Sequence, residues 1–252
     1  MGKIIAVANQ KGGVGKTTTC TNLCCALKNE GKSVLLCDVD PQGNATSGMG
    51  VDKNGVKPTV YDVFVGAAKV SDAVIATKYG DVLPANKDLS GAAIELVGME
   101  SREFILRDAL ESLRDRYDYI VVDCPPSLEM LTLNALCAAD SVLIPVQCEY
   151  FALEGLADLI TTIRGIKRRL NPRLEIEGVL LTMYDGRTNF SAQVAAEVKT
   201  YFRTKVYSVL IPRNVRLSEA PSHGKPAVVY DRSSRGAVAY TQLARELIRA
   251  NR

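Results

Sequence analysis

The sequence predicts an α/β fold, a doubly wound and mainly parallel sheet with helices on both faces. Two observations support this prediction. Short β-branched runs alternate along the chain with longer segments of helical periodicity. The polar motifs follow the expected strands, and ligands of such sheets bind at the carboxyl ends of strands. The chain has 252 residues, of which 47% are hydrophobic and 23% charged, so we expect one domain over residues 1–252 with one sizeable core.

The expected strands are apolar runs bounded by polar, Gly or Pro turns, as in strands buried on both faces. They are Ile4–Val7, Val34–Cys37, Ile120–Val122, Val142–Val146 and Val179–Leu181, with a later strand at Val209–Ile211. Helices are expected at Thr17–Asn29, Arg102–Arg116, Leu153–Leu170, Ser191–Tyr201 and Gly236–Ala250. The last helix would place Val238, Leu243, Leu247 and Ile248 roughly on one face.

The first strand runs into the segment Asn9–Thr18, N-Q-K-G-G-V-G-K-T-T, which precedes a helix. Glycines let successive backbone N–H groups converge on phosphate oxygens, and the helix N-terminus adds partial positive charge. Lys16 would reach the β- and γ-phosphates, and the Thr17 hydroxyl would bind Mg²⁺. The sequence therefore predicts an ATP-binding P-loop, whose contacts would be Lys11, Gly12, Gly13, Val14, Gly15, Lys16, Thr17 and Thr18.

The loop departs from the common pattern G-x-x-x-x-G-K-[ST], because Gln10 stands at the first glycine position. An additional lysine, Lys11, follows it. Lys11 is either a solvated loop residue or a second cation that compensates charge as the β–γ bond breaks. Its place beside the glycines favours the second interpretation.

The segment K-G-G-V-G-K-T-T resembles the deviant Walker A motif of the ParA/MinD ATPases, and most closely that of the chromosomal ParA (Soj) group. The resemblance covers nearly the whole chain and includes the segments Val39–Ser47, Ile120–Ser127 and Ile211–Pro226. It implies a homodimer that sandwiches two ATP molecules, with Lys11 reaching the partner's nucleotide. It also implies hydrolysis of ATP to ADP and phosphate, with Mg²⁺ as the metal.

Carboxylates follow two of the expected strands. Asp38 and Asp40 are either turn formers or groups that hold water and metal near the γ-phosphate. The resemblance favours function, with Asp40 positioning the attacking water and Asp38 supporting the metal site. Asp123 ends the strand Ile120–Val122 and is interpreted as the Walker B carboxylate, which contacts Mg²⁺ through water.

The resemblance also implies an adenine pocket formed by two loops after later strands. The expected contacts are Met183, Pro212, Arg213 and Asn214, although Pro212 could simply terminate a strand. The seven cysteines include no C-x-x-C pair and lie mainly in apolar runs, which predicts buried thiols in a reducing cytosol. No leader and no apolar run of membrane-spanning length is evident, so we expect a cytoplasmic protein without stable membrane association. The resemblance implies that it is associated with the nucleoid.

The net charge is only +3, so partners depend on where the charge lies. Basic residues gather late in the chain: Arg187, Lys199, Arg203, Lys205, Arg213, Arg216, Lys225, Arg232 and Arg235. They are either scattered solvated charges or a surface that binds DNA phosphates without sequence preference. ParA-like proteins bind DNA in this way as ATP-bound dimers, so Arg187 and Arg216 are the first candidates, with a ParB-type protein as the stimulating partner.

Two other functions stay open. A MinD-like ATPase would cycle on membranes, and its relatives carry a basic amphipathic C-terminal helix that lies on anionic lipid. This chain ends A-R-E-L-I-R-A-N-R, without a bulky apolar stripe beyond the closing helix. An amidoligase-type synthetase would phosphorylate a carboxylate instead of water. The D-P-Q-G-N segment and the late arginines fit that class poorly.

Overall fold

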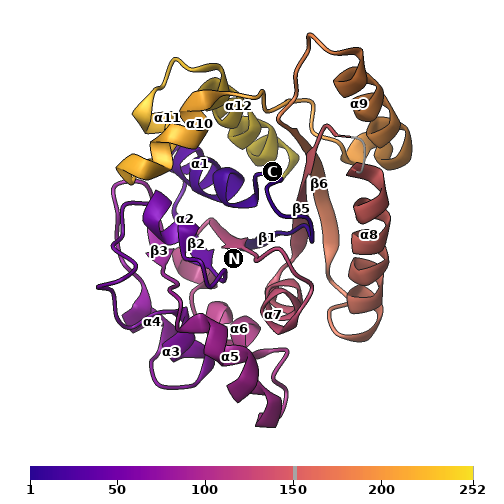
Figure 1. The fold of residues 1–252 in the computed structure, drawn as a ribbon. Helices are drawn as coiled ribbons and strands as arrows, with labels where there is room; N and C mark the ends of the chain where they lie inside the picture. The colour runs from indigo at the N-terminus through magenta and orange to yellow at the C-terminus, as the bar shows by residue number, and fades with distance from the viewer. Residues whose placement is uncertain (150–151, 252) are drawn as a thin grey trace.

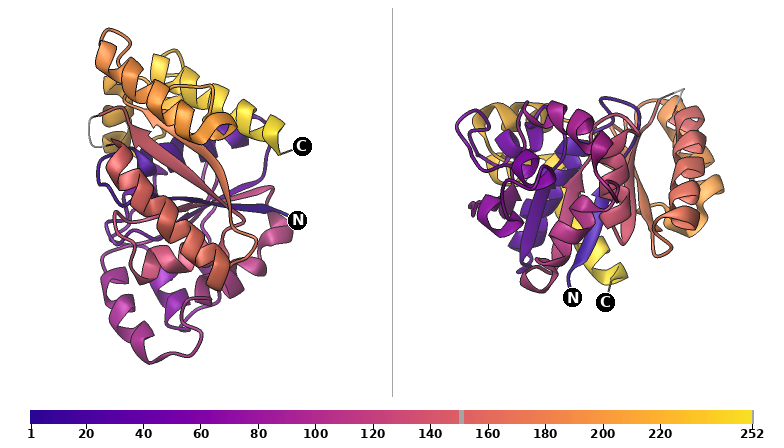
Figure 2. Two further views of the ribbon diagram at one scale, coloured as in Figure 1. Left: turned by 90° about the vertical axis from the view of Figure 1, so that its right-hand side faces the viewer. Right: turned by 90° about the horizontal axis from the view of Figure 1, so that it is seen from below.

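The computed structural model describes residues 1–149 and 152–251. Its six strands form one parallel sheet in the order β3-β2-β4-β1-β5-β6, which passes between two layers of helices (Figures 1 and 2). This arrangement confirms the predicted fold class. The strands are β1 (Lys3–Val7), β2 (Val34–Asp38), β3 (Asp81–Leu83), β4 (Tyr119–Asp123), β5 (Ser141–Gln147) and β6 (Glu175–Thr182).

The α-helices fall between and after these strands. They are α1 (Lys16–Asn29), α2 (Asn44–Gly48), α3 (Val60–Phe64), α4 (Val70–Ala73), α5 (Leu89–Glu95), α6 (Ile105–Glu111), α7 (Met130–Ala138), α8 (Ala152–Arg169), α9 (Asn189–Phe202), α10 (Val215–Glu219), α11 (Ala227–Tyr230) and α12 (Arg235–Ala250). Short 3₁₀ turns are η1 (Leu96–Gly98), η2 (Arg114–Arg116), η3 (Arg203–Lys205) and η4 (Ala220–His223). In the described part of the chain, no helix combines the length and apolar character needed to cross a membrane.

The core has two parts, one on each face of the sheet. Successive strand residues point to opposite faces, so Ile4 packs with α6, α7 and α8, while Ile5 packs with α1 and α12. Figure 1 shows α1 and α10–α12 on one side of the sheet and α7 and α8 on the other. All seven cysteines are buried, as predicted. The N- and C-termini lie side by side (Figure 2), where Lys3 donates a hydrogen bond to Asn251.

Strand register brings the main motifs to one edge of the sheet. Val7 and Asp38 are both paired with Asp123, so the ends of β1, β2 and β4 are level. The segment after β1 and the aspartates at the ends of β2 and β4 therefore meet at the carboxyl edge. The predicted site should therefore lie at this edge of the sheet.

One expected strand is absent, one expected helix is shorter, and one residue lies off the expected face of a helix that is otherwise confirmed. Val209–Ile211 is not a strand, although Ile211 N donates to Leu181 O at 2.9 Å and holds the segment against β6. The helix expected at Arg102–Arg116 is confined to α6 and the turn η2. At its start, Asn134 accepts from Leu106 N and donates to Arg102 O, which holds the preceding residues out of the helix. Val238 is 43% exposed and does not share the buried face of α12.

Strand β3 and helix α7 were not predicted. The first has three residues, too few to show periodicity. The second is apolar on nearly every side and lacks a helical stripe, because it is buried between the sheet and α6.

Candidate functional site

The loop between β1 and α1 has the backbone expected of a phosphate cradle. Gly13 and Gly15 have φ of 73° and 92°, in the left-handed region that side chains disfavour. The helix begins at Lys16, so its first N–H groups face the loop. Lys16 Nζ donates to Lys11 O at 3.0 Å, which folds the lysine over the loop. Thr182 Oγ1 donates to Val14 O at 2.8 Å and ties the loop to β6.

Gln10, which stands at the first glycine position of the common motif, has a structural partner. Its Nε2 donates to Gly155 O at 3.1 Å and links the loop to α8. Asn9 supports the same turn, because its Nδ2 donates to Pro145 O at 2.8 Å and its Oδ1 accepts from Lys11 N at 3.0 Å. The loop is therefore fixed to β5 and α8 as well as to its own strand and helix.

Lys11 lies at the surface, with 39% of its side chain exposed. Its Nζ is 3.8 Å from Glu149 Oε2, and Arg213 Nη2 is 3.8 Å from Glu149 Oε1. Glu149 was not predicted, and it lies between a cation from the phosphate loop and one from the expected adenine loop. Exposed pairs at this distance are weak, so the Lys11 side chain is held only loosely.

Asp123 is the least satisfied carboxylate of the site. Both its oxygens are buried; Oδ1 accepts from Cys20 Sγ at 3.4 Å, while Oδ2 has no hydrogen-bond partner among the described residues. Burial, followed by the charge of Asp38, raises the pKa of Asp123 well above its ordinary value, and hydrogen bonding to the Thr17 hydroxyl and the Cys20 thiol lowers it less. A buried acceptor without a donor is costly unless a ligand completes it. Together with the Thr17 hydroxyl, it fits a hydrated Mg²⁺ ion.

Asp38 is buried as deeply as Asp123, but both of its oxygens have donors. Oδ1 accepts from Asp40 N at 3.1 Å, and Oδ2 accepts from Thr46 N at 2.8 Å and Thr46 Oγ1 at 2.7 Å. Burial raises the pKa of Asp38 to about 6, against the lowering effect of the Thr46 hydrogen bonds. This geometry holds the loop after β2, and a role at the metal is a prediction that it does not test.

Asp40 and Lys16 complete the charged group at the carboxyl edge. Asp40 is mostly buried, and its Oδ1 accepts from Gln42 N at 2.9 Å. Burial lowers the pKa of Lys16, and the negative charges of Asp123 and Asp40 oppose that shift. The predicted phosphate-contacting lysine and the predicted acidic residues are therefore close enough to interact.

A cavity of about 580 Å³ extends from the start of α1. It brings together the predicted loop residues Gly15, Thr17 and Thr18 with the predicted adenine contacts Met183, Pro212, Arg213 and Asn214. The two adenine loops are directly paired, because Tyr184 N donates to Ile211 O at 3.0 Å and Arg213 N donates to Tyr184 O at 3.2 Å. A cavity of this size and mixed lining suits a nucleotide base and ribose.

The cavity also contains residues that sequence reasoning missed: Asn44, Ser47, Lys53, Thr182 and Tyr240. Asn44 and Ser47 stand in the Val39–Ser47 motif, which could have indicated them. Tyr240 has no local signal, because it reaches the site from α12 and its hydroxyl lies 3.1 Å from Thr19 Oγ1.

The predicted DNA contacts lie on the surface, next to the adenine loops. Arg187 is 88% exposed, and its Nη2 is 2.7 Å from Asp185 Oδ2. The hydrogen bonds of Arg187 hold the pKa of Asp185 well below its usual range. Arg216 Nη1 is 2.7 Å from Glu219 Oε2, and its Nε is 3.3 Å from Asp231 Oδ2. Both arginines thus have acidic partners within the chain, and DNA binding by them remains a prediction.

Comparison with known proteins shows the family to which the chain belongs. A family model described as an AAA domain matches residues 2–176. The chain is 61% identical to the sporulation initiation inhibitor protein Soj of Bacillus subtilis, over 98% of each chain. It is 53% identical to the chromosome partitioning protein ParA of Myxococcus xanthus, over 99% of this chain and 89% of that protein.

Solved structures give the same fold. The cell division ATPase MinD of Pyrococcus furiosus superposes with a TM-score of 0.82 at 30% identity, over 99% of this chain and 100% of that one. A protein named cobyrinic acid a,c-diamide synthase from Mycobacterium smegmatis, with bound ADP and magnesium, gives 0.87 at 39% identity, over 99% and 95%. The partition relatives are more similar in sequence than either structure. The chain therefore belongs to the ParA/Soj-type chromosome-partitioning ATPases, within the wider ParA/MinD group.

Proposed function

We propose that this chain binds ATP and Mg²⁺ at the carboxyl edge of its sheet, hydrolyses the ATP, and uses the ATP-bound state to dimerise and bind DNA during chromosome partitioning. The main observation in support is the buried Asp123 Oδ2, which lacks a partner among the described residues beside the P-loop. A group that is costly to leave unsatisfied is retained where a ligand completes it.

The nucleotide would span the cavity from the start of α1 to the paired adenine loops. Backbone N–H groups of the loop and Lys16 would bind the phosphates, and Pro212 would lie against the base. Thr17 and Asp123 are the groups assigned to hold Mg²⁺, with Asp38 in support. When bound, Mg²⁺ supplies charge neutralisation on the β- and γ-phosphates.

Asp40 would orient the attacking water. The water oxygen forms a bond to the γ-phosphorus, and the bond from that phosphorus to the bridging oxygen breaks. The electron pair stays on the β-phosphate of ADP, and the water proton leaves with the phosphate or to solvent. Lys11 and Lys16 would compensate the charge that develops on the bridging oxygen.

Dimerisation would bring Lys11 to the partner's nucleotide. In the chain itself Lys11 is only loosely paired with Glu149, so little opposes its release. ATP stabilises the dimer only if it binds the dimer better than the monomer, and a contact from Lys11 across the interface would supply that difference. Hydrolysis would remove this preference and separate the subunits.

DNA binding would follow from the same loops. Tyr184 and Pro212 are paired as an isolated β-bridge. Arg187 follows the first by three residues and Arg216 follows the second by four, so a nucleotide at Pro212 would be near both. Contacts to phosphates alone give binding that ignores sequence and weakens with salt. Hydrolysis would be slow without a ParB-type partner, because no described side chain of the site is an obvious strong base for water. We place the protein in the cytoplasm, on the nucleoid.

The test is DNA cosedimentation of the purified chain with ATP, with ADP and without nucleotide, over a range of salt. We expect binding only with ATP, to any DNA sequence, and loss of binding in Arg216→Glu. The matched control is Arg107→Glu, which makes the same charge change on α6 and should bind as the wild type does. Binding that is independent of ATP, or absent in every state, would contradict the proposal.

A second arm addresses the membrane alternative, which the likeness to MinD keeps in view. Cosedimentation with anionic lipid vesicles under the same nucleotide conditions should show no ATP-dependent binding. Binding to vesicles with ATP, together with no binding to DNA, would favour the MinD-like function instead.

A further inference from the structure

Thr46, on the five-residue helix α2, occupies an unusual position for a threonine. Its side chain is fully buried, and its hydroxyl makes two hydrogen bonds between separate segments. The Oγ1 donates to Asp38 Oδ2 at 2.7 Å and accepts from Ala85 N at 2.9 Å. The single hydroxyl proton is therefore donated to a carboxylate, and a lone pair of the same oxygen accepts from the backbone of the loop after β3.

The other side of Asp38 leads to the proposed water-positioning residue. Asp38 Oδ1 accepts from Asp40 N at 3.1 Å, so a continuous set of hydrogen bonds runs from Ala85 through Thr46 and Asp38 to Asp40. The turn that follows is closed by Gly43 N, which donates to Asp40 O at 2.9 Å.

Close packing fixes the same turn from its other side. Gly43 has φ of 60°, and a Cβ added to it would lie 2.6 Å from Ala85 O. The Asp40 turn is thus held between the Asp38 carboxylate and the Ala85 loop, and Thr46 is the residue whose side chain joins the two. A buried hydroxyl is costly unless it is hydrogen-bonded, and a valine of the same shape would fill the space without one.

We propose that Thr46 is a positioning residue for ATP hydrolysis, which acts by fixing Asp38 and through it the backbone of Asp40. This inference rests on the proposed role of Asp40. Without the hydroxyl, Asp38 Oδ2 keeps one donor, Thr46 N, and the carboxylate is free to turn away from Asp40 N. Small displacements of a group that orients a reactant cost large factors in rate.

The test compares Thr46→Val with Thr46→Ser, measuring kcat and KM for ATP, equilibrium binding of ATP, and the thermal unfolding midpoint. Valine keeps the shape and removes both hydrogen bonds, whereas serine keeps the hydroxyl and loses a methyl group. We expect Thr46→Val to lower kcat by about 10- to 100-fold with KM and ATP affinity changed by less than about 3-fold, and Thr46→Ser to retain most of kcat.

The matched control is Thr59→Val. Thr59 is also buried, but its hydroxyl donates to Asp62 at the first turn of α3. The Thr59→Val variant should be less stable than the wild type and should keep the wild-type kcat. If Thr46→Val keeps kcat, or if Thr46→Ser is as inactive as Thr46→Val, the proposed positioning role is wrong.

A double variant separates this inference from the role of Asp40. Asp40→Ala alone should abolish most hydrolysis and retain ATP binding, and adding Thr46→Val should then lower kcat no further. If Asp40→Ala hydrolyses ATP normally, the assigned role of Asp40 fails, and the Thr46 inference fails with it. If Asp40→Ala is inactive but Thr46→Val lowers the residual rate of that variant by a further large factor, Thr46 does not act through Asp40.

Discussion

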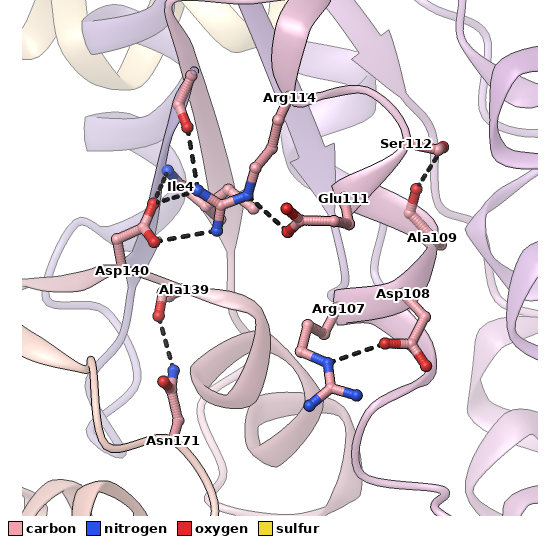
Figure 3. Close-up of polar contacts among 11 residues, drawn as sticks. Ile4, Arg107, Asp108, Ala109, Glu111, Ser112, Arg114, Ala139, Asp140 and Asn171 are labelled. Atoms are coloured by element: carbon pink, nitrogen blue, oxygen red, sulfur yellow. Dashed lines mark hydrogen bonds and ion pairs between the residues drawn. The ribbon is translucent and has the colours of Figure 1, made fainter.

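The two ends of the parallel sheet both bury charge, but they satisfy it differently. At the amino end, Arg114 and Asp140 form a compact group with Glu111 (Figure 3). At the carboxyl end, Lys16 and the aspartates Asp123 and Asp38 are packed beside the phosphate loop.

At the amino end the buried cation is surrounded by opposite charge, although Arg114 Nε has no hydrogen bond of good geometry among the described residues. Arg114 Nη1 and Nη2 each donate to an Asp140 oxygen at 3.0 Å, and Nε lies 2.8 Å from Glu111 Oε2 (Figure 3). Asp140 Oδ2 also accepts from Ile4 N at 2.8 Å, which fixes the start of β1. Glycine at position 2 lets the start of the chain pack closely against the backbone of Arg114 and Tyr117, since a Cβ there would lie 2.0 Å from Tyr117 O.

At the carboxyl end one buried carboxylate oxygen, Asp123 Oδ2, lacks a partner in the part of the chain that the structure describes. A buried cation paired with carboxylates holds the fold together, whereas a buried carboxylate oxygen with neither a donor nor a paired cation among the described residues fits a ligand. The comparison separates stability from function: changes at the amino end should affect unfolding, and changes at the carboxyl end should affect hydrolysis.

The largest expected effect follows from Asp123→Ala. We expect kcat for ATP hydrolysis to fall by about 10²-fold or more, because the proposed Mg²⁺ site loses its carboxylate. The free energy of unfolding of the nucleotide-free protein should not fall, since an unsatisfied buried charge has been removed. Steady-state ATPase assays and denaturant unfolding check both parts. A variant that unfolds much more easily, or one that hydrolyses normally, would remove the contrast between the two ends.

The opposite result is expected for Asp140→Ala. Arg114 and Ile4 N would lose their acceptor, and the free energy of unfolding should fall by about 3 kcal/mol. Below the unfolding temperature, kcat should stay within about 2-fold of the wild type, because the group is at the other end of the sheet. Urea unfolding gives the first quantity. Asp108→Ala, which removes an exposed carboxylate on α6, serves as the control and should leave stability nearly unchanged.

Titration of Asp123 sharpens the comparison. Its pKa is raised in the folded chain, so the unfolded chain loses the proton first as pH rises above about 4. Between that pH and the pKa of Asp123 in the folded chain, the free energy of unfolding of the wild type therefore falls by up to about 1.4 kcal/mol per pH unit relative to a variant without this carboxyl group.

Asp123→Asn should thus become more stable than the wild type as pH increases over that window, in the absence of nucleotide. Urea unfolding of both proteins between pH 4 and pH 8 would measure the difference. A constant difference between the two proteins across this range would show that Asp123 is ionised normally in the folded chain, contrary to this account.

The smallest effect is expected for Arg107→Ala, a second arginine of the amino-end region (Figure 3). Its Nε is 2.8 Å from Asp108 Oδ1 and its guanidinium lies 4.2 Å from the Phe104 ring centre, but the pair is exposed to solvent. We expect the free energy of unfolding to change by less than about 1 kcal/mol. A loss as large as that of Asp140→Ala would mean that burial does not decide which arginine matters.

Much of the site could be read from local sequence. The phosphate loop, the residues Lys16 and Thr17, and the aspartates after β2 and β4 stand in short segments whose chemistry is contained in their own spacing. The ends of β1, β2, β4 and β5 were predicted to within one residue, because buried parallel strands are continuous apolar runs, whereas β6 begins four residues before its predicted start. The three-residue β3 and the evenly apolar α7 carry no such pattern, and they were missed for that reason.

The sequence by itself determined the alternation of strands and helices, the phosphate loop and the acidic residues that follow strands, because these depend on periodicity and turn chemistry within a few residues. Only the tertiary structure decided which carboxylate oxygen lacks a hydrogen bond among the described residues, that Gln10 bonds to α8, and that Tyr240 lines the cavity beside the phosphate loop. Those features depend on strand order and register, which bring together residues up to 221 positions apart in the chain. No local pattern records such a contact, since it forms only when the sheet is assembled and its two helical layers are packed.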